Sequence, residues 1–177
     1  MHILTLIGCP SSGKSTVANK ILQENCDYQI VSTDKVRAKL FGYEFIQGNW
    51  QELENEVFRQ IKQHLNAGYP IIYDATNAKK AWRIELIQKL KQLGDIDVIG
   101  LYVKTPLEIC QQWNQQRERK VPDFIIEDYH QTLKQFPPTP AEGFTTVIDV
   151  LYENGNLAYP KSLYATSKIK SGTGYGS

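Results

Sequence analysis

Short apolar runs alternate along this chain with stretches in which apolar residues recur every three or four positions. Five runs are brief, largely apolar and bounded by turn residues. They are residues 2–7, 29–32, 70–73, 96–103 and 145–152. Such runs predict strands, and the periodic stretches predict helices. Because parallel strands need connections about as long as a helix, the alternation predicts an α/β fold with a mainly parallel five-stranded sheet and helices on both faces.

Three features locate the elements of the second half of the chain. One predicted helix has its apolar positions at Trp82, Leu86, Leu90 and Leu93. Pro106 opens another helix, and an apolar stripe over residues 125–136 predicts the last one. The polar segment 114–122 then links these two C-terminal helices. A turn at 153–156 would allow a hairpin between the fifth strand and residues 157–159.

Length and composition fit one globular domain. The chain has 177 residues, of which 41% are hydrophobic and 22% charged, and its formal net charge is +1. This balance gives no overall attraction to a polyanion, so nucleic acid would have to be bound by a local cluster of cations. Residues 1–159 are expected to form the domain. Residues 160–177 contain lysines but no acidic residue and end in Ser-Gly-Thr-Gly-Tyr-Gly-Ser, which predicts a flexible tail.

The sequence shows no sign of export, membrane insertion or metal binding through cysteine. No apolar run approaches the roughly 20 residues that span a bilayer, and the first ten residues lack the pattern of a leader peptide. We therefore expect a cytoplasmic protein. Cys9, Cys26 and Cys110 lie far apart in sequence without a C-x-x-C pair, so neither a disulfide framework nor a zinc site is indicated.

The strongest motif lies between the first strand and the first helix. Residues 8–15 read Gly-Cys-Pro-Ser-Ser-Gly-Lys-Ser and match G-x-x-x-x-G-K-[ST], the phosphate-binding loop of nucleoside triphosphatases and kinases. The glycines let backbone amides point inward, and the helix N-terminus adds positive potential. Lys14 can reach the β- and γ-phosphates, and the Ser15 hydroxyl can bind Mg²⁺. We predict that ATP is bound by Gly8, Pro10, Ser11, Ser12, Gly13, Lys14, Ser15 and Thr16.

Asp34, after the second strand, has two interpretations. The end of that strand opens onto the same sheet edge as the phosphate loop, so the carboxylate can orient or deprotonate an acceptor hydroxyl. It can equally cap the helix that follows. Arg37, one helical turn later, can pair with Asp34 or bind an acceptor phosphate.

The third strand ends in a second group of polar side chains. Asp74 follows a buried run, which is typical of a carboxylate that binds Mg²⁺ directly or through water, although it can also cap the next helix or pair with Arg37. Thr76 and Asn77 are suited to hold an acceptor or to cap that helix. The pattern leaves these alternatives open.

The link between the last two helices is basic. Arg117, Arg119 and Lys120 fall within four positions, and such cations can stabilise a transferring phosphoryl group when a lid closes over it. The alternative is a solvated basic turn that Glu118 partly neutralises.

Several segments together resemble the polynucleotide 5′-kinase branch of the P-loop kinases. They are GCPSSGKST, STDKVR, YDATN, NQQRERKVP and EGF, and they extend over roughly residues 1–150. The resemblance implies that Asp34 activates the acceptor 5′-hydroxyl and that Arg37 contacts the acceptor's 3′-phosphate. It further implies that Arg117 is the lid arginine beside the ATP phosphates, with Arg119 as the alternative. Trp113 is a departure, because that family often has arginine there.

These observations predict an ATP- and Mg²⁺-dependent kinase that phosphorylates an acceptor hydroxyl, foremost the 5′-hydroxyl end of DNA or RNA. A P-loop kinase for a sugar, nucleoside or antibiotic is the second hypothesis, and the near-zero net charge favours it. A nucleotide-binding regulatory ATPase is the third, but such a protein has no use for an acceptor-facing Asp34 and Arg37. No segment indicates an obligate protein partner.

Overall fold

The computed structural model describes residues 1–44, 46–160 and 163. Its strands are β1 (His2–Ile7), β2 (Gln29–Ser32), β3 (Ile71–Asp74), β4 (Asp97–Lys104), β5 (Thr146–Glu153) and β6 (Asn156–Ala158). Its helices are α1 (Lys14–Glu24), α2 (Thr33–Phe41), α3 (Trp50–Asn66), α4 (Lys80–Lys91), α5 (Leu107–Gln115), α6 (Asp123–Gln135) and the short 3₁₀ helix η1 (Pro140–Glu142).

The strands form one sheet in the order β2-β3-β1-β4-β5-β6, in which the first five strands are parallel. The predicted α/β class and parallel sheet are thus confirmed, but the predicted count of five strands is wrong by one. The sixth strand pairs antiparallel with β5 through a two-residue turn. Asn154 and Gly155 at its centre have φ of 50° and 79°, and positive φ at both residues is the hairpin geometry that matches strand twist.

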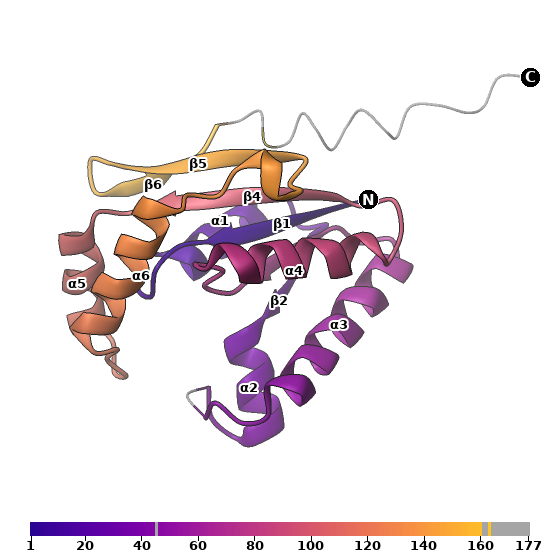
Figure 1. Ribbon diagram of the computed structural model, residues 1–177, viewed down its shortest axis with the longest axis horizontal. Helices are drawn as coiled ribbons and strands as arrows, with labels where there is room; N and C mark the ends of the chain where they lie inside the picture. The colour runs from indigo at the N-terminus through magenta and orange to yellow at the C-terminus, as the bar shows by residue number, and fades with distance from the viewer. Residues whose placement is uncertain (45, 161–162, 164–177) are drawn as a thin grey trace, which may run out of the picture.

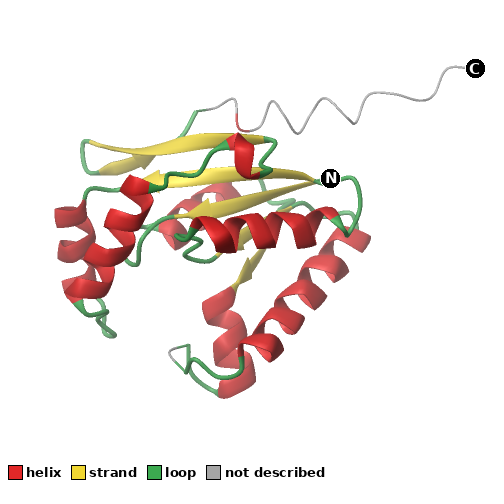
Figure 2. Cartoon of the chain, in the orientation of Figure 1, coloured by secondary structure: helices red, strands yellow, loops and turns green. Residues whose placement is uncertain are grey.

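Helices cover both faces of the sheet, as Figures 1 and 2 show. The central strand β1 is buried on both sides, with Ile3 and Ile7 in one apolar cluster and Leu4 and Leu6 in the other. The first cluster also contains side chains of α2, α3, α4 and α6. The second contains side chains of α1 and also Leu157 from β6. Burial on both faces explains why the strands read as continuous apolar runs.

The predicted apolar face of α4 is wrong at both ends, because Trp82 is exposed in the first turn and Leu93 is exposed beyond the last residue, Lys91. Trp82 is 44% exposed, whereas the neighbouring Arg83 is completely buried. The guanidinium of Arg83 is paired inside the protein, so Arg83 belongs to the buried face of α4 and Trp82 lies outside that face.

The helices beyond the sheet form two pairs. Figure 1 shows α2 beside α3 and α5 beside α6, with the two pairs apart from each other. Of the predicted tail 160–177, only Pro160 and Leu163 are among the described residues, and Leu163 is buried in the second apolar cluster. No helix in the described part of the chain is long and apolar enough to cross a membrane.

Candidate active site

The phosphate loop connects β1 to α1 in a conformation that requires its two glycines. Gly13, at the N-cap of α1, has φ of 92°, which side chains rarely tolerate. A Cβ atom there would lie 2.6 Å from Leu157 Cδ1, and one on Gly8 would lie 2.5 Å from Ser12 Oγ. The strand–loop–helix context predicted for the motif is therefore present.

Lys14 lies across this loop. Its Nζ donates hydrogen bonds to the carbonyl oxygens of Gly8, at 3.1 Å, and Cys9, at 2.8 Å. Burial lowers the pKa of Lys14, while Asp74, Cys9 and Asp34 act in the opposite direction. The carboxylates of Asp74, at the end of β3, and of Asp34, in α2, thus both favour the charged form of Lys14.

Ser15 and Asp74 meet next to the loop. The Ser15 hydroxyl donates a 2.8 Å hydrogen bond to Asp74 Oδ2. The alternative interpretations of Asp74 do not match the structure, because Lys79 occupies the N-cap position of α4 and Arg37 pairs with Asp34. A hydroxyl and a carboxylate are hard oxygen donors, so the chemistry of this pair fits Mg²⁺.

Thr76 and Asn77 support the base of the phosphate loop. The Thr76 carbonyl oxygen accepts a 3.1 Å hydrogen bond from the Gly8 amide. The buried Asn77 has φ of 50°, and its Nδ2 donates to the Leu6 carbonyl oxygen at 2.8 Å. Neither residue caps α4. The side-chain amide of Asn77 thus binds a backbone carbonyl oxygen at the end of β1. Contact of the Thr76 or Asn77 side chain with an acceptor stays a prediction.

Asp34 lies in the first turn of α2 and does not cap it. The strand ends two residues earlier, at Ser32, whose side chain is the cap and accepts from the Lys35 amide. Arg37 Nη1 donates to Asp34 Oδ1 at 2.8 Å, and the two side chains are 18% and 55% exposed. Arg37 Nε is buried without a hydrogen-bond partner among the described residues. The pair therefore combines an accessible carboxylate with a buried donor that has no partner among the described residues.

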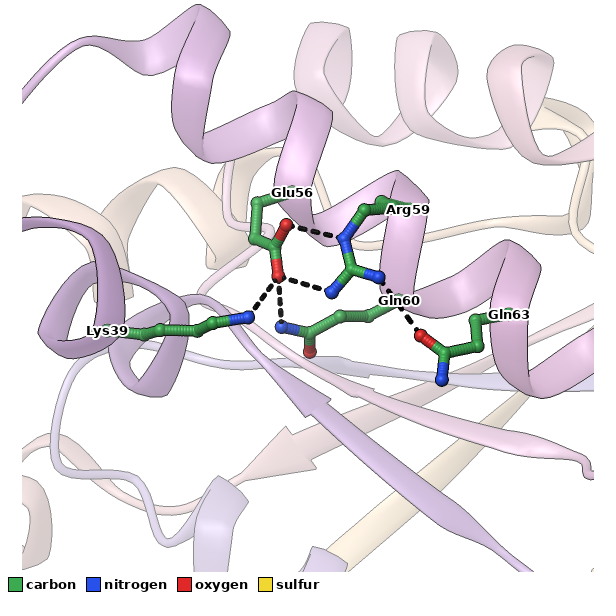
Figure 3. A network of polar contacts seen from close by, with 5 residues as sticks. All are labelled: Lys39, Glu56, Arg59, Gln60 and Gln63. Atoms are coloured by element: carbon green, nitrogen blue, oxygen red, sulfur yellow. Dashed lines mark hydrogen bonds and ion pairs between the residues drawn. The ribbon is translucent and has the colours of Figure 1, made fainter.

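A polar network holds α2 against α3, as Figure 3 shows. Glu56 of α3 accepts from Lys39 of α2 at 2.8 Å, and also from Arg59 and Gln60 of its own helix. Hydrogen bonds from Arg59, Lys39 and Gln60 lower the pKa of Glu56 well below its usual range. This network fixes the helix that carries Asp34.

The predicted lid touches the phosphate loop through one of its arginines. Arg117 Nη1 donates to Ser11 Oγ at 3.2 Å. Arg119 lies exposed in the same connection between α5 and α6. Arg117 therefore contacts the phosphate loop directly.

Asn114 is a site residue that the sequence reasoning assigned no role. It is completely buried, and its Oδ1 accepts from the Val121 amide at 2.9 Å while its Nδ2 donates to the Val121 carbonyl oxygen at 2.7 Å. Ser11 also donates to Oδ1, at 3.3 Å. The side-chain amide of Asn114 therefore joins the two ends of the connection that contains Arg117, and it also binds Ser11 of the phosphate loop. Only its place in the segment NQQRERKVP pointed toward it.

Trp113, the departure from the family pattern, packs against the domain. Its ring meets that of Tyr152 edge-on, with centroids 5.9 Å apart. One of its ring carbons lies 3.1 Å from where a Cβ on Gly13 would be. The tryptophan thus packs where the phosphate loop enters α1.

Arg83 and Glu142 form a second unit that the sequence reasoning missed. Arg83 Nε and Nη2 donate to the two carboxylate oxygens of Glu142 at 2.6 and 2.7 Å. The remaining donors reach the carbonyl oxygens of Ala78, at 2.7 Å, and Phe136, at 2.9 Å. This pair joins the connection after β3, the end of α6 and η1. Glu142 of the Glu-Gly-Phe segment therefore has a structural role, as the ion-pair partner of Arg83.

The sheet order and the phosphate loop define a P-loop nucleotide-binding protein. A family described as an AAA domain matches residues 3–136, and the chain belongs to this family of P-loop kinase domains. Membership implies ATP binding, usually together with Mg²⁺.

Three known proteins are similar to this chain. The L-seryl-tRNA(Sec) kinase of Methanococcus maripaludis is 28% identical over 138 residues, which are 73% of this chain and 51% of that protein. The chain therefore spans about half the length of this curated relative. A chain of the Pnkp1/Rnl/Hen1 RNA repair complex has a TM-score of 0.62 at 21% identity and covers 76% of this chain and 44% of its own length. A gluconokinase from Sinorhizobium meliloti has a TM-score of 0.51 at 17% identity, with 86% and 84% covered.

Proposed function

We propose that this chain transfers the γ-phosphoryl group of ATP to the 5′-hydroxyl end of DNA or RNA. The observation that carries the proposal is the Asp34–Arg37 pair, which combines an accessible carboxylate with a buried, unused guanidinium donor. A carboxylate serves an acceptor hydroxyl, and an unpaired arginine donor serves an acceptor that carries a phosphate. A polynucleotide end offers both groups.

The nucleotide side of the proposed site is built from the phosphate loop. Its backbone amides and Lys14 bind the β- and γ-phosphates, for which Lys14 exchanges its present carbonyl partners for phosphate oxygens. Ser15 and Asp74 would hold Mg²⁺, which when bound neutralises charge on the phosphate oxygens. Arg117, already in contact with Ser11, stabilises the charge that develops on the transferring group.

On the acceptor side, Asp34 accepts the proton of the 5′-hydroxyl as its oxygen attacks the γ-phosphorus. The loose transition state of phosphoryl transfer demands little base strength, so an ordinary carboxylate suffices when it is well oriented. Arg37 orients Asp34 through the 2.8 Å ion pair, and its guanidinium would turn outward to bring the now buried Nε to a phosphate of the acceptor. ADP leaves with the electron pair of the broken bond.

The relatives support an acceptor carried on RNA. One relative is named as a kinase of seryl-tRNA, and one structural neighbour belongs to an RNA repair complex. A small-molecule acceptor is the second candidate, favoured by the net charge of +1, which gives no general attraction to nucleic acid. The similarity to a gluconokinase over most of both chains is consistent with that alternative.

The test is incubation with γ-labelled ATP, Mg²⁺ and a panel of acceptors. The panel holds 5′-hydroxyl RNA and DNA oligonucleotides, the same oligonucleotides with a 5′-phosphate, seryl-tRNA, nucleosides and hexoses. We expect label only on the 5′-hydroxyl oligonucleotides, and none with Lys14→Ala. Label on a nucleoside or sugar alone would transfer the assignment to a small-molecule kinase, label on seryl-tRNA alone would move the acceptor to the aminoacyl group, and ATP hydrolysis without labelled acceptor would contradict kinase activity.

A further inference from the structure

Two cysteines that the proposed reaction does not use face each other beside the phosphate loop. The sulfur atoms of Cys9 and Cys110 are 3.4 Å apart and share a hydrogen bond, although 101 residues separate them in sequence. Cys9 is the second residue of the phosphate loop, and Cys110 lies in α5, the helix that leads into the connection containing Arg117. The two side chains are 2% and 0% exposed. The fold has thus placed a dithiol between the loop and the proposed lid.

The two thiols are electrostatically unequal. The hydrogen bond with Cys110 lowers the pKa of Cys9, burial opposes this, and the Lys14 ammonium adds to the lowering. The same hydrogen bond and burial raise the pKa of Cys110. The nearby Lys14 ammonium and these directions favour Cys9 as the nucleophile of the pair and Cys110 as its partner. Such an asymmetric pair provides an attacking thiolate and a resolving thiol.

A small pocket adjoins Cys9. A pocket of about 120 Å³ between the end of β4 and α6 is lined by Cys9 together with Thr105, His130 and Lys134. The pocket is large enough for water-sized molecules, and hydrogen peroxide is only slightly larger than water. The low exposure of Cys9 excludes bulky oxidants, so the proposal below requires a small oxidant that enters through this pocket.

We propose that Cys9 and Cys110 are an oxidation site for peroxides, at which a reversible disulfide inactivates the phosphate loop. The Cys9 thiolate attacks one peroxide oxygen, the O–O bond breaks, and Cys9 becomes a sulfenic acid as water leaves after protonation. Cys110 then attacks the Cys9 sulfur, and its proton leaves with the hydroxyl group as a second water. Two thiols and one peroxide thus give one disulfide and two waters, with the thiols oxidised and the peroxide reduced.

Formation of this bond distorts the loop. The sulfur atoms must close from 3.4 Å to about 2.05 Å, the length of a disulfide bond. The Cys9 carbonyl oxygen accepts hydrogen bonds from Lys14 at 2.8 Å and from the Ser12 amide at 3.2 Å, so a shift of Cys9 moves both groups. Lys14 and the Ser12 amide are groups that hold the phosphates of ATP, and the loss of one hydrogen bond to a charged group costs about 1.5–3 kcal/mol. The disulfide is therefore expected to weaken ATP binding and not merely to add a cross-link.

The test uses the full chain, treated with hydrogen peroxide and then alkylated under denaturing conditions. Peptide mapping is expected to recover a linked pair of peptides containing Cys9 and Cys110, two hydrogens lighter than the separate thiols. Calorimetry with ATP and Mg²⁺ is expected to show affinity reduced by about tenfold or more, the effect of losing one hydrogen bond to a charged group, and dithiothreitol is expected to restore it. Neither readout depends on the identity of the acceptor.

Two variants separate this pair from other thiol chemistry. Cys26→Ser removes the exposed cysteine and is expected to leave the cross-link and the loss of ATP binding unchanged. Cys110→Ser is expected to yield no cross-linked peptide. Recovery of both alkylated thiols at positions 9 and 110, under conditions that oxidise Cys26, would overturn the proposal. A disulfide that leaves ATP affinity unchanged would overturn the proposal that oxidation inactivates the phosphate loop.

Discussion

The hydroxyl of Ser15 donates a 2.8 Å hydrogen bond to the carboxylate of Asp74, joining the first turn of α1 to the end of β3. The two residues are 59 positions apart in sequence. Strand β1, which leads into the phosphate loop and α1, lies next to β3 in the sheet, so the carboxyl ends of both strands open at the same edge. This contact brings the phosphate loop and the proposed Mg²⁺ ligand into one site.

Asp74→Asn is expected to raise the Mg²⁺ concentration required for half-maximal activity. The change keeps the shape of the side chain but removes the negative charge that a hard cation requires. The loss of an outer-shell partner alone costs about tenfold or more in metal affinity, so a shift of at least that size is expected. Titration of activity against Mg²⁺ measures it, with Asp128→Asn on the exposed face of α6 as the matched control. An unchanged Mg²⁺ requirement would remove Asp74 from the metal site.

Asp34→Asn is expected to lower turnover by about a hundredfold or more, the range contributed by general acid–base groups. ATP affinity is expected to change little, because the Asp34 carboxylate pairs with Arg37 and acts on Lys14 only through its charge. Steady-state kinetics with the labelled acceptor and calorimetry with ATP measure the two quantities. Asp27→Asn, an exposed change before β2, is the control. Normal turnover in Asp34→Asn would show that the acceptor proton leaves by another route.

The phosphate loop, the parallel sheet and the acidic residue after β2 could be predicted because their signals are local. Gly8 and Gly13 reveal a backbone conformation, and an apolar run reveals a buried strand, without knowledge of the rest of the fold. The alternative prediction that Asp34 caps α2 was wrong, because another polar residue two positions earlier serves as the cap. Ser32, which ends the strand, lies close enough to α2 to supply the capping oxygen.

Asn114 could not be assigned from its neighbours, because its partners lie in a connection that folds back upon it. We expect Asn114→Ala to lower turnover by about tenfold or more, since the connection that contains Arg117 loses its closure and misplaced groups cost rate steeply. The adjacent exposed Gln115→Ala is the control.

A double-mutant cycle separates positioning from loss of fold for this residue. If Asn114 acts by placing Arg117, then Arg117→Ala lowers turnover in the native chain but adds little in the Asn114→Ala background. Kinetics and thermal unfolding of the four proteins supply the readouts. Fully additive effects of the two changes would show that Asn114 does not act through Arg117.

The buried pair of Arg83 and Glu142 predicts a large asymmetry between single and double substitutions. Glu142→Ala leaves a buried guanidinium without its carboxylate and is expected to cost about 3–5 kcal/mol of unfolding free energy. Arg83→Met combined with Glu142→Leu removes both charges and is expected to be much less destabilising. Urea unfolding measures both, and Asp149→Ala, which breaks the exposed pair with Lys104, is expected to cost no more than about 1 kcal/mol. Equal losses in single and double variants would contradict this explanation.

No pattern in the sequence announces that pair. Where a tryptophan and an arginine are neighbours in a helix, the sequence predicts that the tryptophan is buried and the arginine exposed. The reason is that an isolated charge is costly to bury. In this protein the arginine is buried and the tryptophan exposed. Glu142 and the carbonyl oxygens of Ala78 and Phe136 accept the hydrogen bonds of the buried guanidinium. Such compensation becomes visible only when the fold has brought those segments together.

Glu56 predicts a pH-dependent contribution to stability. Its partners Arg59, Lys39 and Gln60 hold the pKa of the folded state below that of the unfolded chain. The carboxylate therefore stabilises the fold at pH values above the ordinary glutamate pKa, and this contribution is lost as the pH falls through the lower pKa of the folded state. Glu56→Gln is thus expected to lower the melting temperature at pH 7, with the difference shrinking as the pH drops below about 4. Melting curves over that range measure it beside Glu153→Gln, an exposed control at the end of β5. A difference between the native and Glu56→Gln proteins that stays constant with pH would show that Glu56 acts without its charge.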